Sequence, residues 1–497
     1  MHSLGTLLPG SQPDSPGSSI FDLPTRPRPP RLSTILSPDG RGHKTDLVEP
    51  PVKEDNSKAS YLVISGGTGC NSICSAFGNA CYVLPVSDDG GSSSEIIRVM
   101  GGPSIGDIRS RLIRLIPPAP RGSPLEAIRI LLSHRFPAHC SEREARDEWR
   151  DIVEGKSLLW SGIPSDRKEL IRGFLVYFEN ELLKRAHKSF SFRNGRFVTA
   201  FHCQAHWYNA LSIFSVGNYF LAAVQEFFRS LPSAIFLFAS ITNSQADILP
   251  VIVTNHTVTI AAELENGRKL VGQCNISHPV PSGPSINVTD SDPGSPMIFH
   301  QANVMFEQTS KDGIEALESP ISRLYYINAY GHEIQPGPNP DYISSLSTKD
   351  ILVYSCGSLW TSIIPCLALR GVAAAIAGSH SLRAKVLLLN AKNDRETDGY
   401  DAADYISAII GSLTSSGTSS PLVPLSVYPI SAFITHLVYL KGTTVPVDVE
   451  HITSLGVRCV EVRGDENCLK DGPPRFDAAS VRWAIDEILA EDGSRSD

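Results

Sequence analysis

The fold expected for this chain rests on the stretch from Tyr61 to Arg109, which reads YLVISGGTGCNSICSAFGNACYVLPVSDDGGSSSEIIRVMGGPSIGDIR. It begins with a short apolar strand, Tyr61–Ile64, and contains a second strand at 81–86. Each strand is followed by a polar, glycine-rich turn. In a parallel sheet both turns would lie at the carboxyl edge, where open α/β folds bind ligands.

The first turn, Ser65-Gly66-Gly67-Thr68-Gly69, has the composition of a phosphate-binding turn. Glycines let the backbone approach a phosphate closely, and N–H groups at the start of a following helix can hold an anion. The turn lacks the lysine of a Walker loop and does not have GxGxxG spacing. A plain strand-to-helix turn is the alternative interpretation.

The next two turns carry charged side chains. Asp88 and Asp89 follow the second strand and could bind a divalent cation or hydrogen-bond a sugar or base. A common Asp-Asp-Gly-Gly surface turn is the alternative. The third turn brings Asp107 and Arg109 close together in sequence, and the arginines that follow, Arg111 and Arg114, are expected on a solvated helix face.

Later segments continue the alternation of strands and helices. The strand at 351–354 is apolar on both faces, as in the interior of a parallel sheet, and 385–389 is similar. Apolar stripes with helical spacing occupy parts of 125–183. The residues from 248 to 276 are expected to be rich in β-strand, and Asp477 is expected to cap a final helix. The predicted fold is therefore α/β: a three-layer, Rossmann-like, doubly wound, mostly parallel sheet with a helical insertion.

The expected domain organisation has three parts. Residues 1–58 are rich in proline and serine and are predicted to be a disordered tail, because they cannot bury enough surface to offset the cost of ordering. Residues 59–470 form the α/β domain, with a helical insertion at 117–215 and a loop insertion at 279–320. Residues 471–497 add a C-terminal helix to the same domain.

Composition limits the classes of function. Of the 497 residues, 41% are hydrophobic, which suffices for a large core, and the net charge of −8 gives no case for nucleic-acid binding. No apolar run approaches the roughly eighteen residues that span a bilayer, and no signal peptide is recognisable at the N-terminus. The ten cysteines are scattered, which indicates reduced thiols. We expect a cytoplasmic homo-oligomer without a nucleic-acid or membrane partner.

The turns GGTG, DDGGSS and GDIR, in this order, resemble those of the 2-phospho-L-lactate transferase (CofD-like) family, and most of all its gluconeogenesis-factor branch. Three later blocks agree with the family pattern: 214–223, which contains Gly217-Asn218; 355–365, SCGSLWTSIIP; and 393–400, NDRETDGY. The chain has Ser355-Cys356 where the family has Gly-Pro. The proline-rich tail suggests a eukaryotic member.

The resemblance implies a transferase that binds a nucleoside-diphosphate-linked donor and, with Mg²⁺, passes a phosphate-containing group to a deazaflavin alcohol. Asp107 aligns with the carboxylate that holds the acceptor, and Arg109 would lie nearby as the second catalytic residue. Asp88 and Asp89 would hold the metal, and Asn218 would be a nucleotide contact or a helix cap. The diphosphate would be cradled by the turn at 66–69 and by Gly357, Ser358, Thr361 and Ser362. Asn390 and Glu396 to Asp398 are further candidates for the site, or surface-loop residues.

A second function fits the same motifs. The protein could bind a nucleotide sugar without catalysis and regulate carbon metabolism or cell-wall synthesis, as the bacterial branch of the family implies. Both functions require a nucleoside diphosphate or nucleotide-sugar ligand.

Overall fold

The computed structural model describes residues 59–137, 140–185, 215–278, 316–415, 428–464 and 473–493. Its centre is a seven-stranded sheet in which each neighbouring pair is parallel. The strands are β1 (Tyr61–Ile64), β2 (Cys81–Leu84), β3 (Asp247–Pro250), β8 (Ile351–Tyr354), β9 (Ala384–Leu388), β10 (His436–Leu440) and β11 (Arg458–Val462). β2, β8 and β9 are buried along their whole length, which explains why these segments are apolar on both faces.

The order of the strands reverses next to the first strand. The order is β11-β10-β9-β8-β1-β2-β3, so the chain builds outward from β1 in one direction and later returns to build outward from β8 in the other. A crevice forms at such a switch point, outside the carboxyl ends of the two central strands. The turns that follow β1 and β8 therefore meet where an open α/β sheet binds its ligand.

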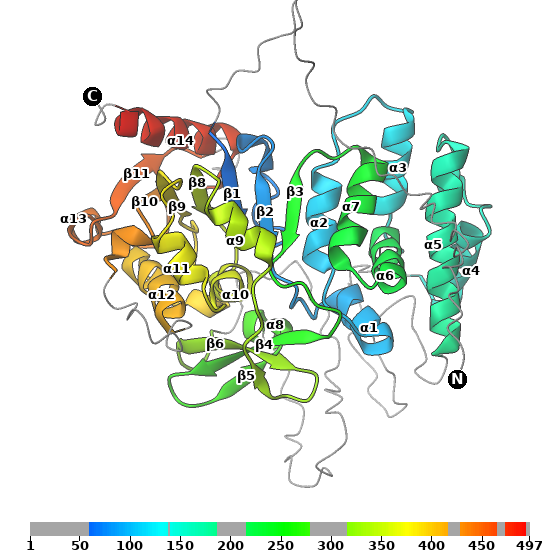
Figure 1. Ribbon diagram of the computed structural model, residues 1–497, viewed down its shortest axis with the longest axis horizontal. Coiled ribbons are helices and arrows are strands. Elements are labelled where there is room, and N and C mark those ends of the chain that lie inside the picture. Colours follow the sequence, from blue (N-terminus) through cyan, green and yellow to red (C-terminus); the bar gives the residue numbers. More distant parts are fainter. Residues whose placement is uncertain are drawn as a thin grey trace, which may run out of the picture. The chain divides into compact units, whose positions relative to one another are not determined.

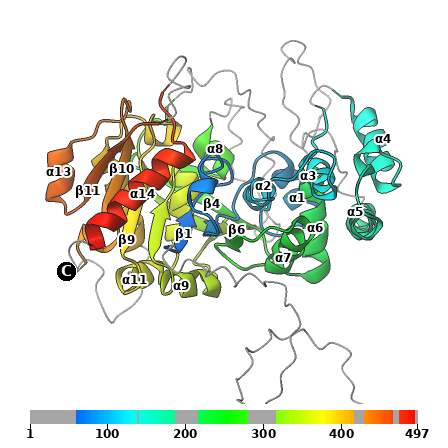
Figure 2. The ribbon, with the colours of Figure 1, turned by 90° about the horizontal axis from the view of Figure 1, so that it is seen from above.

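Helices flank the strands, and Figures 1 and 2 show α1 to α7 gathered at the β3 end, with β10, β11 and α13 at the other. In the first half of the chain they are α1 (Gly91–Met100), α2 (Gly106–Arg114), α3 (Pro124–Ser133), α4 (Glu142–Val153), α5 (Ser165–Lys184), α6 (Val216–Phe228), α7 (Leu231–Thr242) and α8 (Gln273–Ser277). The second half adds α9 (Pro340–Leu346), α10 (Ile364–Leu367), α11 (Val372–Ala377), α12 (Ala402–Ser415), α13 (Val449–Ser454) and α14 (Ala478–Gly493). Short 3-10 helices lie at η1 (Cys74–Ala76), η2 (Leu158–Trp160), η6 (Arg395–Thr397) and η8 (Ile430–Ala432), and a π-helix at η5 (Leu359–Ile363).

Local sequence explains how several helices begin. The Ser123 side chain accepts a hydrogen bond from the Glu126 N–H and is followed by proline at the first helical position of α3. A capping box formed by Ser141 and Glu144 starts α4. At α14 the Asp477 carboxylate accepts the Ser480 N–H at 2.8 Å, which confirms the predicted cap.

A second, four-stranded antiparallel sheet has the order β5-β4-β6-β7. Its strands are β4 (Val258–Leu264), β5 (Lys269–Val271), β6 (Ile321–Asn328) and β7 (Glu333–Ile334). In Figure 1 this sheet lies below the parallel strands, next to α8 and α10. It brings α8 towards the turn after β2.

The predicted α/β, Rossmann-like architecture is confirmed. One local prediction is wrong. No α-helix follows the turn at 65–69, where the chain forms only the short η1 before β2; the turn is instead held by contacts with other segments. The segment 248–276 is rich in strand as predicted, with β4 and β5, and its last residues begin α8. The predicted tail at 1–58 and most of the loop insertion, 279–315, lie outside the described residues.

Candidate functional site

The turn after β1 packs against two distant parts of the chain, the start of α2 and the loop after β8. A methyl group added at Gly66 would lie 2.9 Å from Cβ of Ser362, and one at Gly67 would lie 2.6 Å from Cα of Asp107. One at Gly69 would lie 2.5 Å from the carbonyl oxygen of Cys356. All three separations are shorter than real side chains tolerate. The glycines therefore permit close packing between turns, a role that the sequence analysis did not consider, and only Thr68 and Gly69 are exposed.

The two adjacent aspartates after β2 have separate partners. The Asp88 carboxylate accepts the Gly90 N–H at 2.9 Å and the Ser93 hydroxyl at 3.3 Å, which fixes the start of α1. The Asp89 carboxylate accepts the Cys274 N–H at 2.9 Å, in the first turn of α8. Asp89 thus serves as a long-range cap, and burial raises its pKa to about 6. No sequence signal connects residues 89 and 274.

Asp107 lies in the first turn of α2, next to Gly67 and near Asp88. Its Oδ2 atom is buried and accepts no hydrogen bond from any of the described residues. Burial and the charge of Asp88 raise the pKa of Asp107 to about 7, although a hydrogen bond from the Gly67 backbone and the charge of Arg111 oppose the shift. A carboxylate with an unsatisfied oxygen beside a second carboxylate is a site where a cation or a donor group would be stabilised.

Arg109 is held in place by the start of α6. Its Nε donates to Oδ1 of Asn218 at 3.0 Å, and a methyl group at Gly217 would lie 3.3 Å from its Cγ. The N-cap of α6 is Ser215, so the interpretation of Asn218 as a helix cap is wrong. Burial, followed by the charge of Arg135, lowers the pKa of Arg109 to about 10.

The loop after β8 is organised by a carboxylate from the turn after β9. Glu396 accepts the Trp360 N–H at 3.0 Å, the Thr361 N–H at 3.2 Å and the Thr361 hydroxyl at 2.7 Å. Thr361, predicted to bind phosphate, is thus buried and its hydroxyl is directed at Glu396. Burial and the charge of Asp394 raise the pKa of Glu396 to about 8.

The remaining residues of that loop lie at the switch point. Gly357 has a positive φ of 140° and exchanges two hydrogen bonds with the Asn390 side chain, at 3.0 and 2.7 Å. Ser358 donates to Asp394 at 3.4 Å. Because Gly357 also lies beside Gly69 and Ser362 beside Gly66, the structure brings the turns after β1 and β8 together.

Arg111 is the clearest departure from the sequence prediction. It was expected on a solvated face of α2 and is instead 0% exposed. Its Nη2 donates to the Ser65 hydroxyl at 3.1 Å and to the Gly66 carbonyl at 2.9 Å, and its Nη1 donates to Cys74 Sγ. α2 buries Ile108, Arg109, Arg111 and Leu112, so it is enclosed on more of its surface than its sequence pattern indicates.

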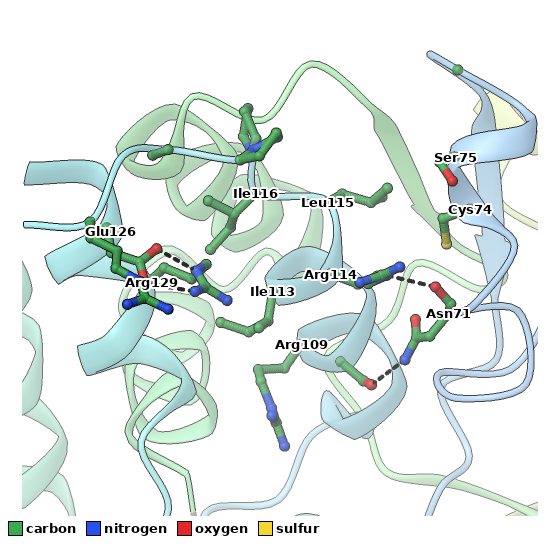
Figure 3. A pocket seen from close by; sticks show the side chains of 16 residues that line it. Asn71, Cys74, Ser75, Arg109, Ile113, Arg114, Leu115, Ile116, Glu126 and Arg129 are labelled. Atoms are coloured by element: carbon green, nitrogen blue, oxygen red, sulfur yellow. Dashed lines mark hydrogen bonds and ion pairs between the residues drawn. The ribbon is translucent and has the colours of Figure 1, made fainter. Parts of the chain in front are cut away.

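A cavity of about 840 Å³ runs along α2 (Figure 3). Arg109 lies at its wall, so the cavity adjoins the residues described above. Its lining combines four arginines with the apolar residues Ile113, Leu115, Ile116, Pro117, Pro118 and Ala119. The chemically functional side chains of the lining include Asn71, Cys74, Arg109, Arg114, Arg121, Glu126 and Arg129.

The described ranges contain neither a membrane-spanning helix nor a cluster of metal-ligating side chains. No helix there has the length and apolar character to cross a bilayer. In the same residues no three or more His, Cys, Asp or Glu side chains are grouped as a metal site.

Comparisons with known proteins agree with the fold. The family described as 2-phospho-L-lactate transferase CofD matches residues 62–463. An uncharacterised protein of Saccharomyces cerevisiae, YNL011C, is 33% identical over 455 residues, which cover 82% of this chain and 96% of the yeast protein. The gluconeogenesis factor of Halalkalibacterium halodurans is 24% identical over 203 residues, covering 41% of this chain and 48% of that protein.

A solved structure shows the same architecture. Protein BH3568 from Bacillus halodurans superposes with a TM-score of 0.52 at 19% identity, covering 86% of this chain and 99% of that protein. The parallel sheet, the site turns and the extent of the match lead to one conclusion: this chain belongs to the 2-phospho-L-lactate transferase CofD family.

Proposed function

We propose that the protein is a transferase that binds a nucleoside-diphosphate-linked donor at the β1–β8 switch point and transfers a phosphate-containing group. The observation that carries the proposal is the convergence of four separate turns on one edge of the sheet. Gly67 packs on Asp107, Gly69 on Gly357, and Gly217 on Arg109. Family membership supports the reaction class, whereas the fold alone would not.

In this proposal Asp107 and Arg109 lie closest to the chemistry. The unpartnered oxygen of Asp107 can accept a hydrogen bond from an acceptor hydroxyl and hold it for attack. Arg109 is fixed by Asn218 and brings a cation to the same region, where it would stabilise negative charge that develops on a phosphoryl oxygen.

Asp88 and Asp107, rather than the predicted pair Asp88 and Asp89, are the carboxylates that fit a magnesium ion. Asp88 and Asp107 repel one another, and Oδ2 of Asp107 has no partner among the described residues. Mg²⁺ is commonly held by one or two carboxylates together with substrate phosphates, which suits this pair. The ion would supply charge neutralisation at the phosphate oxygens. Asp89, the other carboxylate predicted for the metal, is engaged by the Cys274 N–H.

The test is calorimetric titration with guanosine diphosphate, uridine diphosphate and UDP-sugars, with and without MgCl₂. We expect one of them to bind in a magnesium-dependent manner. Asp107→Asn should reduce the gain in nucleotide affinity that MgCl₂ produces. Asp166→Asn, which changes an exposed carboxylate on α5, is the matched control and should keep that gain. The proposal fails if no nucleotide binds, or if Asp107→Asn retains full magnesium dependence.

The alternative, a nucleotide-sugar-binding regulator without catalysis, has one observation in its favour. Glu396 already occupies the Trp360 and Thr361 N–H groups, so the loop after β8 offers fewer donors to a diphosphate than the sequence suggests. Binding of a UDP-sugar without any product detectable by mass spectrometry would favour the regulator. A guanosine preference with magnesium-dependent turnover would favour the transferase.

A further inference from the structure

Arg111 is a buried cation whose hydrogen-bonding partners include a thiol. It is 0% exposed, and its hydrogen-bond partners among the described residues are Ser65, the Gly66 carbonyl and Cys74, none of them a carboxylate, although the charge of Asp107 also acts on its guanidinium. The group also lies 4.9 Å from the centre of the Tyr82 ring. A buried charge is unfavourable unless an opposite charge or a full set of hydrogen bonds compensates it, and Nε of Arg111 has no hydrogen-bond partner among the residues that the structure describes.

Cys74 is the group placed to supply that compensation. Its sulfur accepts a hydrogen bond from Nη1 of Arg111. Cys70 is its neighbour, since Cys74 Sγ lies 3.1 Å from the Cys70 carbonyl oxygen. We propose that Cys74 is a reactive cysteine, held as a thiolate against Arg111, and that it is modified through the adjoining cavity by hydroperoxides and other soft electrophiles.

Several groups face Cys74 and act in opposite directions. The Cys70 thiol and the Arg111 guanidinium favour its thiolate, whereas burial opposes it, and the net effect lowers the pKa of Cys74 to about 6. The contact of 3.1 Å between Cys74 Sγ and the Cys70 carbonyl favours the protonated thiol. Tyr82 and Cys356 are the other titratable neighbours, and burial raises the pKa of both.

The cavity brings reagents next to Cys74. Cys74 is 4% exposed and forms part of the cavity wall with Asn71 and Arg114, as Figure 3 shows. Arg109, Arg114, Arg121 and Arg129 line the same cavity with one carboxylate, Glu126. The excess of positive charge would raise the local concentration of anionic reagents.

Cys70 completes a two-step reaction with a hydroperoxide. The Cys74 thiolate attacks the terminal peroxide oxygen: an S–O bond forms, the O–O bond breaks, and the alcohol leaves after taking a proton from solvent. Sulfur is oxidised by two electrons and the peroxide is reduced. Its contact with Cys74 and its burial raise the pKa of Cys70, so Cys70 attacks the sulfenyl sulfur as a thiol: an S–S bond forms, the S–O bond breaks, and the Cys70 proton passes to the departing hydroxide, which leaves as water.

The first test is site-resolved alkylation of the full chain by iodoacetamide, measured by mass spectrometry from pH 5 to pH 9. The rate at Cys74 should level off above about pH 7, one unit past its pKa, whereas the partly exposed Cys459 should still be rising at pH 9. Arg111→Gln should move the Cys74 profile to higher pH. Profiles of the same midpoint at both cysteines, or a profile unchanged in Arg111→Gln, would overturn the proposal.

Two further measurements keep the test decisive should Arg111→Gln fail to fold. The ratio of the alkylation rate by anionic iodoacetate to that by neutral iodoacetamide should be higher at Cys74 than at Cys459. High salt should remove this difference, because it screens the charges of the cavity. With cumene hydroperoxide, the peptide containing Cys70 and Cys74 should lose two hydrogens in the parent but not in Cys74→Ser. Equal reagent preference at both cysteines, together with no peroxide product in the parent, would refute both the access route and the chemistry.

Discussion

Replacing Asp107 by Asn gives a prediction whose sign depends on pH. The pKa of Asp107 rises from 3.8 to about 7, with burial as the main cause and the charge of Asp88 second. Because the folded protein binds this proton more tightly than the unfolded chain, the stability that the residue contributes is present below its unfolded pKa. It is lost as pH rises towards the folded pKa.

The structure also gives the magnitude. Each unit of pKa corresponds to about 1.4 kcal/mol, and the slope falls as the folded carboxyl begins to ionise near pH 7, so the parent should lose about 2 kcal/mol at this site between pH 5 and pH 7. Asn resembles the protonated acid and does not titrate. Its amide can keep the contact with Gly67, and no hydrogen bond to Oδ2 is lost, because that atom has none among the described residues. Asp107→Asn should therefore become progressively more stable than the parent as pH rises.

The assay is urea denaturation of the ligand-free protein in EDTA, followed by tryptophan fluorescence at pH 5, 6, 7 and 8. Glu144→Gln is the control with the opposite sign, since hydrogen bonds from Ser141 lower the pKa of Glu144. It should be less stable than the parent by an amount that stays constant from pH 5 to pH 8, because Glu144 is ionised in both the folded and the unfolded chain above its usual pKa of 4.5. A difference in the free energy of unfolding between Asp107→Asn and the parent that stays constant or shrinks with rising pH would show that burial does not raise the pKa of this carboxyl.

Three further predictions concern the packing of the turns. Gly66→Ala should lower stability by about 1–3 kcal/mol because its methyl group meets Ser362, and Ser362→Gly in the same chain should restore part of the loss in thermal melts. Glu396→Ala should lower the free energy of unfolding by at least about 2 kcal/mol, since it leaves buried N–H groups unpaired; Glu396→Gln should lose less in the same urea titration. Asp89→Ala should cost about 1 kcal/mol and speed amide exchange at Cys274, and unchanged exchange there would argue against the cap.

Much of the fold could be predicted from the sequence. Short apolar strands with both faces buried, each ending in a polar turn, are a local pattern, so β1, β2, β8 and β9 were identified from their residues. The family could be recognised for the same reason, because its motifs are contiguous runs of a few residues. The candidate positions in these motifs also gather near the switch point, since the carboxyl ends of neighbouring parallel strands lie at one edge.

The tertiary structure decided what each polar group touches. Asp89 caps a helix 185 residues away, Glu396 satisfies the N–H groups of the loop after β8, and Arg111 is enclosed between the turn after β1 and Cys74. None of these contacts can be recognised from a periodic or local pattern in the sequence, because each joins segments that come together only when the sheet is packed. A sequence gives the kinds of charge that a turn carries, but whether a charge faces water, a ligand or a backbone N–H depends on which distant segments exclude the solvent around it.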